Sequence, residues 1–335
     1  MANPAFALVG SETLLGREVR DLGAAAPALD LRLIASDEEE PGTLTRMGDQ
    51  PTVLTGLDAE ALSDVTAVIL AGSAESSRKA LELATVPVID LTYTAEDRPE
   101  ARLRAPMLEE EGEDGKEEDA RDATIHVIAH PAAIALALFL NRLNSREPIA
   151  QSVVQIFAPA SEHGAKAVEE LQNQTVSLFS FKSLPQAIFD AQLGFNLLAR
   201  YGEQAPISLE DSELRIERHL ATLLARPGED SPAPFPSMRL VQAPVFHGYS
   251  FSVWVDFEEP PDIESLEEGL VTPLVEVRGR DFDPPTNVGQ AGQTGVAVGA
   301  ISPDRNRSTA AWFWLVADNL RLAAENAVAV ARELA

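Results

Sequence analysis

The sequence predicts an α/β protein with two domains, a doubly wound parallel sheet and a second domain of the α+β type. Over residues 1–131, short apolar segments typical of buried strands alternate with amphipathic segments typical of helices. Over residues 132–309, longer segments alternate apolar and polar residues, which indicates a largely antiparallel sheet. Residues 310–335 contain no glycine or proline and carry an apolar stripe, so we expect a C-terminal helix that packs back on the first domain.

Five strands are expected in the first domain, with helices between them. The strands are residues 5–9, 31–35, 66–70, 86–90 and 124–129. One helix should end at Leu22 and another should span residues 75–83. Since strands that alternate with helices through short turns are typical of βαβ units, the sheet should be parallel.

His130 and Pro131 join the strand at 124–129 to an apolar helix. Proline is favoured in the first turn of a helix, where its missing N–H would have no partner inside the helix. The amide groups at such a helix start are a ready place for an anion or a nucleophile. Here Ala132 and Ala133 occupy the tip, and alanine can do no acid–base or covalent chemistry.

The second domain has an equally regular pattern. Strands are expected at 152–159 and, as a pair, within 238–257, and helices at 164–174 and 215–224. Trp312, Phe313 and Trp314 are expected to pack in the interior as part of the C-terminal helix.

Composition excludes several classes of function. The chain has 26 Lys and Arg against 53 Asp and Glu, a formal charge of -27, which repels nucleic acid and anionic membranes. It has no cysteine, so thiolate metal sites and thiol nucleophiles are excluded. The longest apolar run, residues 132–140, is too short to span a membrane, and the N-terminus has no basic region typical of a secretory signal. We therefore expect a cytoplasmic protein.

The acidic segment 109–122 is expected to be a solvated surface loop, with an interaction segment as the alternative.

A glycine turn after the first strand is the candidate cofactor site. Gly10 and Gly16 follow a strand and open a helix, the context of a dinucleotide-binding turn. Such a turn usually has a middle glycine, which lets the backbone approach the pyrophosphate of the ligand; here that position is Thr13. Glu12 next to it adds a negative charge beside the place of the pyrophosphate. Asp37 lies where an acceptor for a ribose 2′-hydroxyl would be expected.

A second turn, at Gly72, follows the strand at 66–70 and completes this candidate set. Glu38, Glu39 and Glu40 would repel a 2′-phosphate, so NAD is favoured over NADP if a nucleotide binds. The alternatives are an emptied or weak nucleotide site and a site that still binds NAD.

Other site patterns are weak. The five histidines are His126, His130, His163, His219 and His247, and their spacing predicts no metal site. Residues 248–252 are similar to a nucleophile elbow but lack its final glycine and lie in a strand pattern, so ordinary strand alternation is the better interpretation.

Several segments along nearly the whole chain resemble the aspartate-β-semialdehyde dehydrogenase family. They are the first glycine turn, VPVID at 86–90, the HPAAIAL junction, SEHGAKAVEELQNQT at 161–175, QAPVFHGYSFSV at 242–253, FDPPTNVGQAGQTGVAVG at 282–299 and WFWLVADNLRLAAENAVAVA at 312–331. The resemblance implies a Rossmann-like NAD-binding domain (1–131, completed by 310–335), an inserted dimerisation domain (132–309) and a homodimer.

The family's catalytic residues are not matched by this chain. The resemblance places the nucleophilic cysteine at Ala133, the active-site glutamine at Ala158, the arginine that binds the substrate carboxylate at Gln242 and the general-base histidine at Tyr249. Without a thiolate no covalent acyl-enzyme can form, and without the arginine the carboxylate has no bidentate partner. A tyrosine, with an ordinary pKa near 10, is a poor general base at neutral pH.

Three hypotheses follow. The first is a non-catalytic homodimer with a structural or regulatory role, resembling the family's cysteine-less paralogues and able to associate with a catalytic paralogue. The second is an NAD(P)-dependent oxidoreductase with altered chemistry on an aldehyde or acyl phosphate. The third is an enzyme of unrelated chemistry, which no motif in the sequence supports.

Overall fold

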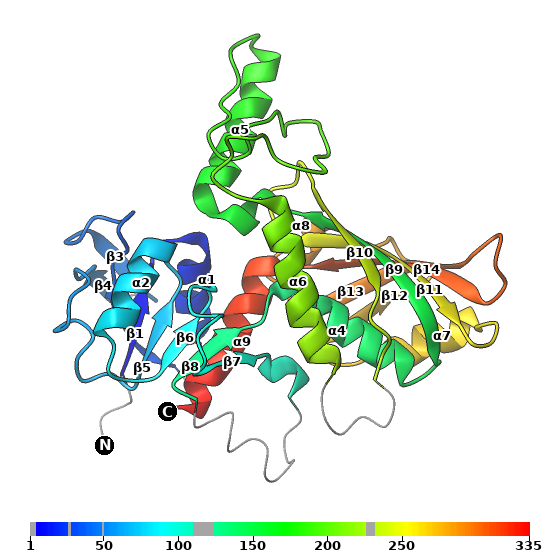
Figure 1. Cartoon of the computed structure of the whole chain (residues 1–335), viewed down its shortest axis with the longest axis horizontal. Coiled ribbons are helices and arrows are strands. Elements are labelled where there is room, and N and C mark those ends of the chain that lie inside the picture. The colour runs from blue at the N-terminus through cyan, green and yellow to red at the C-terminus, as the bar shows by residue number, and fades with distance from the viewer. Residues whose placement is uncertain (1–4, 26–27, 49, 110–122, 226–231) are drawn as a thin grey trace. The chain divides into compact units, whose positions relative to one another are not determined.

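The computed structural model describes residues 5–25, 28–48, 50–109, 123–225 and 232–335. The chain divides into two compact units (Figure 1). Unit 1 comprises residues 1–129 and 323–335, and unit 2 comprises residues 130–322. No helix in the described ranges is long and apolar enough to cross a membrane.

Unit 1 is built on a six-stranded parallel sheet, as its apolar β–α alternation predicts. The strands are β1 (Ala5–Val9), β2 (Asp30–Ile34), β5 (Ala67–Leu70), β6 (Val88–Asp90), β7 (Ala101–Arg104) and β8 (Ile125–Ile128), and their order is β2-β1-β5-β6-β8-β7. Every pairing is parallel. Chain order reverses between β1 and β5, which makes their carboxyl ends the switch point of the sheet.

Helices cover both faces of this sheet. Alternate residues of β1 separate them: Phe6 and Leu8 belong to the core with α1 (Leu14–Gly23) and α9 (Asn319–Glu333), whereas Ala7 and Val9 belong to the core with α2 (Ala74–Leu83). The expected packing of the C-terminal helix on the first domain is confirmed, because buried residues from 323 to 331 lie in the first of these cores.

Three strands of unit 1 were not predicted. The hairpin of β3 (Leu44–Met47) and β4 (Gln50–Val53) and the edge strand β7 carry charged or polar residues and are partly exposed, so they lack the apolar pattern of the central strands. A short 3₁₀ helix, η1 (Pro106–Leu108), follows β7. Within the acidic segment, residues 110–122 lie outside the described residues, and Glu109 binds Arg104 rather than only solvent.

The expected helix over residues 310–335 is wrong in its first part. Residues Ala310–Ala317 form strand β14, and the helix begins only at Asn319. Asp318 makes this break, since its carboxylate accepts the backbone N–H groups of Leu320 and Arg321 and so caps α9. Trp312 is 42% exposed, so its expected interior position is also wrong.

Unit 2 contains a six-stranded mixed sheet. Its order is β10 (Ser237–Gln242), β9 (Ile149–Ala158), β11 (Tyr249–Phe257), β14, β13 (Val296–Pro303) and β12 (Val275–Arg278). The three central pairings are antiparallel, as expected, but both edge strands pair in parallel.

Unit 2 also contains the helices that frame its polar residues. They are α4 (Pro131–Asn144), the 3₁₀ helix η2 (Ala160–His163), α5 (Gly164–Phe179), α6 (Leu209–Leu224), α7 (Ile263–Leu270) and the short α8 (Asn287–Gln290). Pro131 is in the first turn of α4, as predicted, and His130 is the N-cap. Phe139 of α4 packs on Phe313 of the sheet with ring centroids 5.1 Å apart.

Candidate functional site

At the carboxyl ends of β1 and β5, which we call the switch-point edge of unit 1, the two glycine turns contact each other. Gly10 has a φ of +83°, and a Cβ on it would lie 2.3 Å from the Cα of Gly72, so only glycine fits. The hydroxyl of Thr13 lies 2.8 Å from the carbonyl oxygens of both Gly10 and Ala71, and it accepts the N–H of Gly16 at 2.9 Å. Thr13 therefore ties the turn after β1 to the turn after β5.

The backbone donors at this edge bind a carboxylate of the same chain. One oxygen of Glu39 accepts the N–H of Glu12 at 2.8 Å, and its other oxygen accepts the N–H of Ser36, also at 2.8 Å. Glu12 and Ser36 lie in the loops that follow the neighbouring strands β1 and β2. Glu39 thus bridges two strand ends at the place where an open α/β sheet binds its ligand.

Two further carboxylates use the other donors of this edge. Glu12 accepts hydrogen bonds from Arg20, Arg17 and Thr45. Burial would raise the pKa of Glu12, but the Thr45 hydroxyl and the charges of Arg20 and Arg17 lower it below its usual value.

Asp37 accepts a hydrogen bond from the hydroxyl of Ser73, the N-cap of α2. Burial would raise the pKa of Asp37, but the hydrogen bond from Ser73 lowers it. This carboxylate is therefore ionised at neutral pH. Asp37 is turned toward the second helix start rather than left available as a ribose acceptor.

A nicotinamide dinucleotide, which the family resemblance implies, does not fit these donors as they stand. Its phosphates would approach the start of α1, close to the carboxylates of Glu12, Asp37 and Glu39. Gly10, Thr13, Gly16, Asp37 and Gly72 lie together at one edge, which also holds the carboxylates of Glu12 and Glu39. That these five residues bind a cofactor stays a prediction.

The four positions to which the resemblance assigns the family's catalytic residues lie within unit 2. Ala133 is fully buried in the first turn of α4. Ala158 and Gln242 are paired at the ends of β9 and β10, and Tyr249 begins the adjacent β11. The ring of Tyr249 lies 5.8 Å from that of His130, edge to face.

Gln242 is bound entirely by the chain itself. Its amide nitrogen donates to the carbonyl oxygens of Ala158 at 2.9 Å and Ala243 at 3.1 Å, and its amide oxygen accepts the hydroxyl of Tyr201 at 2.8 Å. His163 lies 2.8 Å from the same hydroxyl oxygen. Burial raises the pKa of Tyr201, so its hydroxyl stays protonated and donates to Gln242.

His130 and Glu162 form the second half of this cluster. The Nε2 atom of His130 lies 2.8 Å from a carboxylate oxygen of Glu162, and its Nδ1 atom accepts the N–H of Ala132 at 3.2 Å. The Nε2 atom is therefore the ring nitrogen that faces Glu162 as its hydrogen-bond donor. His130 therefore caps its own helix, where the sequence suggested a place for an anion or a nucleophile.

Glu162 is ionised although most of its side chain is buried. Burial alone would raise its pKa, but His130, then His163 and the hydroxyl of Tyr249, lower the pKa from the usual 4.5 to about 2. Burial lowers the pKa of His163, with the charge of Glu162 opposing this effect. We call His130, Glu162, His163, Tyr201, Gln242 and Tyr249 the buried polar cluster.

Sequence reasoning found Gln242 and Tyr249 but missed their partners. Glu162 and His163 lie in the SEHG segment, and His130 lies at the HPAAIAL junction. Their position in segments that resemble the family was the one sequence feature that could have identified them. Nothing in the sequence marked Tyr201, which lies 41 residues from Gln242.

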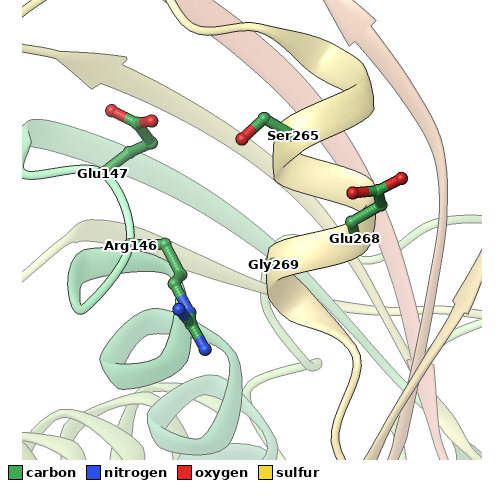
Figure 2. A pocket seen from close by; sticks show the side chains of 5 residues that line it. All are labelled: Arg146, Glu147, Ser265, Glu268 and Gly269. Atoms are coloured by element: carbon green, nitrogen blue, oxygen red, sulfur yellow. The ribbon is translucent and has the colours of Figure 1, made fainter.

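A pocket of about 390 Å³ lies elsewhere in unit 2. Figure 2 shows Arg146 and Glu147 after the end of α4, facing Ser265, Glu268 and Gly269 of α7. None of the residues singled out in the sequence lines it. Among the described residues, no group of three or more His, Asp or Glu side chains could hold a metal ion.

Comparison with known proteins decides the family. Residues 140–322 match the family model for the semialdehyde dehydrogenase dimerisation domain. A USG-1 protein homolog from Pseudomonas aeruginosa is 30% identical over 314 residues, covering 90% of this chain and 88% of the relative. The chain belongs to the aspartate-semialdehyde dehydrogenase family. The aspartate-semialdehyde dehydrogenase of Rickettsia bellii is 27% identical over 98% of this chain and 97% of its own length.

The solved structures agree with this family. That of a probable aspartate-semialdehyde dehydrogenase from Pseudomonas aeruginosa matches with a TM-score of 0.83 and 27% identity, covering 99% of this chain and 98% of the other. The α/β fold with a Rossmann-like parallel sheet and a second, mixed-sheet domain is thereby confirmed.

The Asp318–Asn319 pair, part of the most specific family-like segment, has a structural role in this family member. Asp318 caps α9 and also accepts the N–H of Gly292 at 2.7 Å. The Asn319 side-chain oxygen accepts the N–H of Gly248 at 3.0 Å and lies 3.1 Å from the hydroxyl of Ser161. Asn319 thus joins the start of η2, which carries Glu162, to the turn before Tyr249.

Proposed function

We propose that this chain is a homodimeric family member that does not catalyse the semialdehyde dehydrogenase reaction and has a structural or regulatory role. The observation that carries this proposal is the state of Gln242. It stands where the family has a substrate-binding arginine, is fully buried, and uses its amide in three hydrogen bonds to the chain. Its amide is committed to the fold and has no charge to bind a carboxylate.

The other positions support the same proposal. Ala133 offers no nucleophile. Tyr249 is 1% exposed and contacts His130 and Phe251, so its hydroxyl lies in the interior rather than at an open site.

The test is an assay of the purified protein with aspartate β-semialdehyde, inorganic phosphate and either NAD⁺ or NADP⁺. We expect no reduced nicotinamide above the rate without protein. The Ala133→Cys variant should be equally inactive, because a thiol alone restores neither a carboxylate-binding arginine nor a base. Turnover by the unmodified protein would overturn the proposal and favour an oxidoreductase of altered chemistry.

The proposed homodimer is supported by the family model, which describes a dimerisation domain, and by one row of the mixed sheet. Val153, Trp254 and Trp312 stand side by side on β9, β11 and β14. Val153 is 43% and Trp312 is 42% exposed, and the indole nitrogens of both tryptophans bind Asp304. Such a fixed apolar row is suited to burial against a second copy.

Light scattering on the purified protein tests this assembly. We expect the mass of a dimer, and the Val153→Asp variant should shift it toward the monomer, because it would place an unpaired charge in the apolar row. A monomer at micromolar concentration would contradict the homodimer. The matched variant Val288→Asp changes a side chain that is 90% exposed and should leave the dimer intact.

A further inference from the structure

We propose that Glu39 is an internal substitute for a ligand phosphate: its carboxylate occupies the anion-binding donors at the switch point of unit 1 and so excludes phosphate-bearing ligands. The proposal rests on the geometry of unit 1 alone. Its failure would leave the proposed loss of catalysis intact, because that concerns residues of unit 2.

The donors that Glu39 binds belong to two separate loops. Each oxygen of its carboxylate accepts one backbone N–H at 2.8 Å, from Glu12 after β1 and from Ser36 after β2. Charge-assisted hydrogen bonds to a carboxylate are stronger than those between neutral groups. The Glu39 side chain therefore does what a bound phosphate oxygen pair would do, and it joins the two loops without a ligand.

The cations of the same edge are also bound internally. Arg20 and Arg17 both contact the carboxylate of Glu12, which lies next to the amide bound by Glu39. A phosphate that approached this edge would therefore meet guanidinium groups already neutralised by Glu12. It would also have to displace the carboxylate of Glu39. Because this carboxylate is attached to the same chain, its effective concentration at the donors is high, and a free phosphate competes with it poorly.

Glu39 differs in this respect from the neighbouring Glu40. Glu40 is exposed, and only its backbone oxygen takes part in the local turn, where it accepts a hydrogen bond from Thr43. The two residues have the same charge and almost the same place in the chain. Glu40 is thus a matched control for the bulk charge of this segment.

The experiment compares thermal unfolding of the full chain and its Glu39→Ala and Glu40→Ala variants. Each is measured in sodium chloride and in sodium phosphate of equal ionic strength. In chloride, Glu39→Ala should unfold at a lower temperature than Glu40→Ala, because two amide groups lose their acceptor. In phosphate, the midpoint of Glu39→Ala should rise by about 2 °C or more beyond any rise of Glu40→Ala, because phosphate binds the vacated donors.

An equal response of the two variants to phosphate would overturn the proposal. If Glu39→Ala does not fold, Glu39→Gln replaces it, since glutamine keeps one acceptor oxygen but removes the charge. A phosphate-dependent rise in Glu39→Gln that exceeds the rise in Glu40→Gln supports the proposal, and equal responses overturn it.

Discussion

The switch-point edge of unit 1 and the buried polar cluster of unit 2 are both filled by the chain's own side chains, but by different physical means. At the edge, three carboxylates bind amides, guanidinium groups and two hydroxyls, and the side chain of Glu12 is still 20% exposed. In the cluster, Gln242 is fully buried and His130 has a side chain that is 1% exposed.

This difference determines what each region should tolerate. Water and salt can replace or screen much of an ion pair at a partly exposed edge. A buried group that loses its partner bears the full cost of desolvation. The cluster should therefore respond strongly to single substitutions, and the edge should respond weakly except at Glu39, which binds two main-chain donors.

The largest effect is expected for Gln242→Arg, which introduces the residue that the resemblance implies at this position. The variant buries a guanidinium among carbonyl groups and removes the acceptor of the Tyr201 hydroxyl. We expect a loss of about 3 kcal/mol or more in the free energy of unfolding, measured with urea at pH 7. Gln172→Arg, at an exposed position of α5, makes the same chemical change and should cost little. Equal costs for the two variants would show that Gln242 is not tied into the cluster as described.

A smaller effect is expected for Glu162→Gln. The variant removes the charged acceptor of His130, so it should lose about 2 kcal/mol of unfolding free energy at pH 7. Because the pKa of Glu162 is lowered from 4.5 to about 2, its contribution is fully present above pH 4.5 and is lost as the pH falls toward 2.

The difference in stability between the wild type and Glu162→Gln should therefore shrink between pH 4.5 and pH 3. Urea unfolding at several pH values measures this, with the exposed Glu169→Gln as the control. A difference that is constant with pH would contradict the account of an ionised, buried carboxylate.

The smallest effect is expected at the edge, for Glu12→Gln. Its partners Arg20 and Arg17 have side chains that are 13% and 55% exposed. The loss should be below about 1 kcal/mol at low salt and smaller still in 1 M sodium chloride, because solvent reaches this partly exposed network and salt screens its ion pairs. A double-mutant cycle with Arg20→Gln gives the pair's coupling energy directly. A coupling energy as large as the effect at Glu162 would abolish the contrast between the two regions.

The central strands could be predicted because each is a short apolar run bounded by turn residues, as in residues 5–9 and 67–70. The same rule failed at Ala310–Ala317. This strand pairs with β11 on one side and β13 on the other, and a strand at the centre of a sheet can be apolar on both faces. Its sequence therefore lacks the alternation that separates a strand from a helix.

The candidate site could be located from the sequence but not assembled. The resemblance assigned two catalytic positions to Gln242 and Tyr249, and the strand register places these residues near each other. Hydrogen-bond partners are far apart in the chain: Tyr201 lies 41 residues from Gln242, and Glu162 lies 32 residues from His130. At the edge of unit 1, Glu39 lies 27 residues from Glu12. The sequence shows that these residues are acidic, but it does not show which donors their carboxylates contact. Only the folded chain shows that those donors belong to the chain itself.

The most direct test of the whole account is a calorimetric titration of the unmodified protein with NAD⁺ and NADP⁺ at pH 7.5, with thermal unfolding alongside. A ligand at 100 times its dissociation constant would add about 2.7 kcal/mol of stability, which is easily detected. We expect no binding heat and no shift in the unfolding midpoint with either dinucleotide at millimolar concentration. Saturable binding of either one would contradict it, because the dinucleotide would have to displace Glu39 from the amides of Glu12 and Ser36.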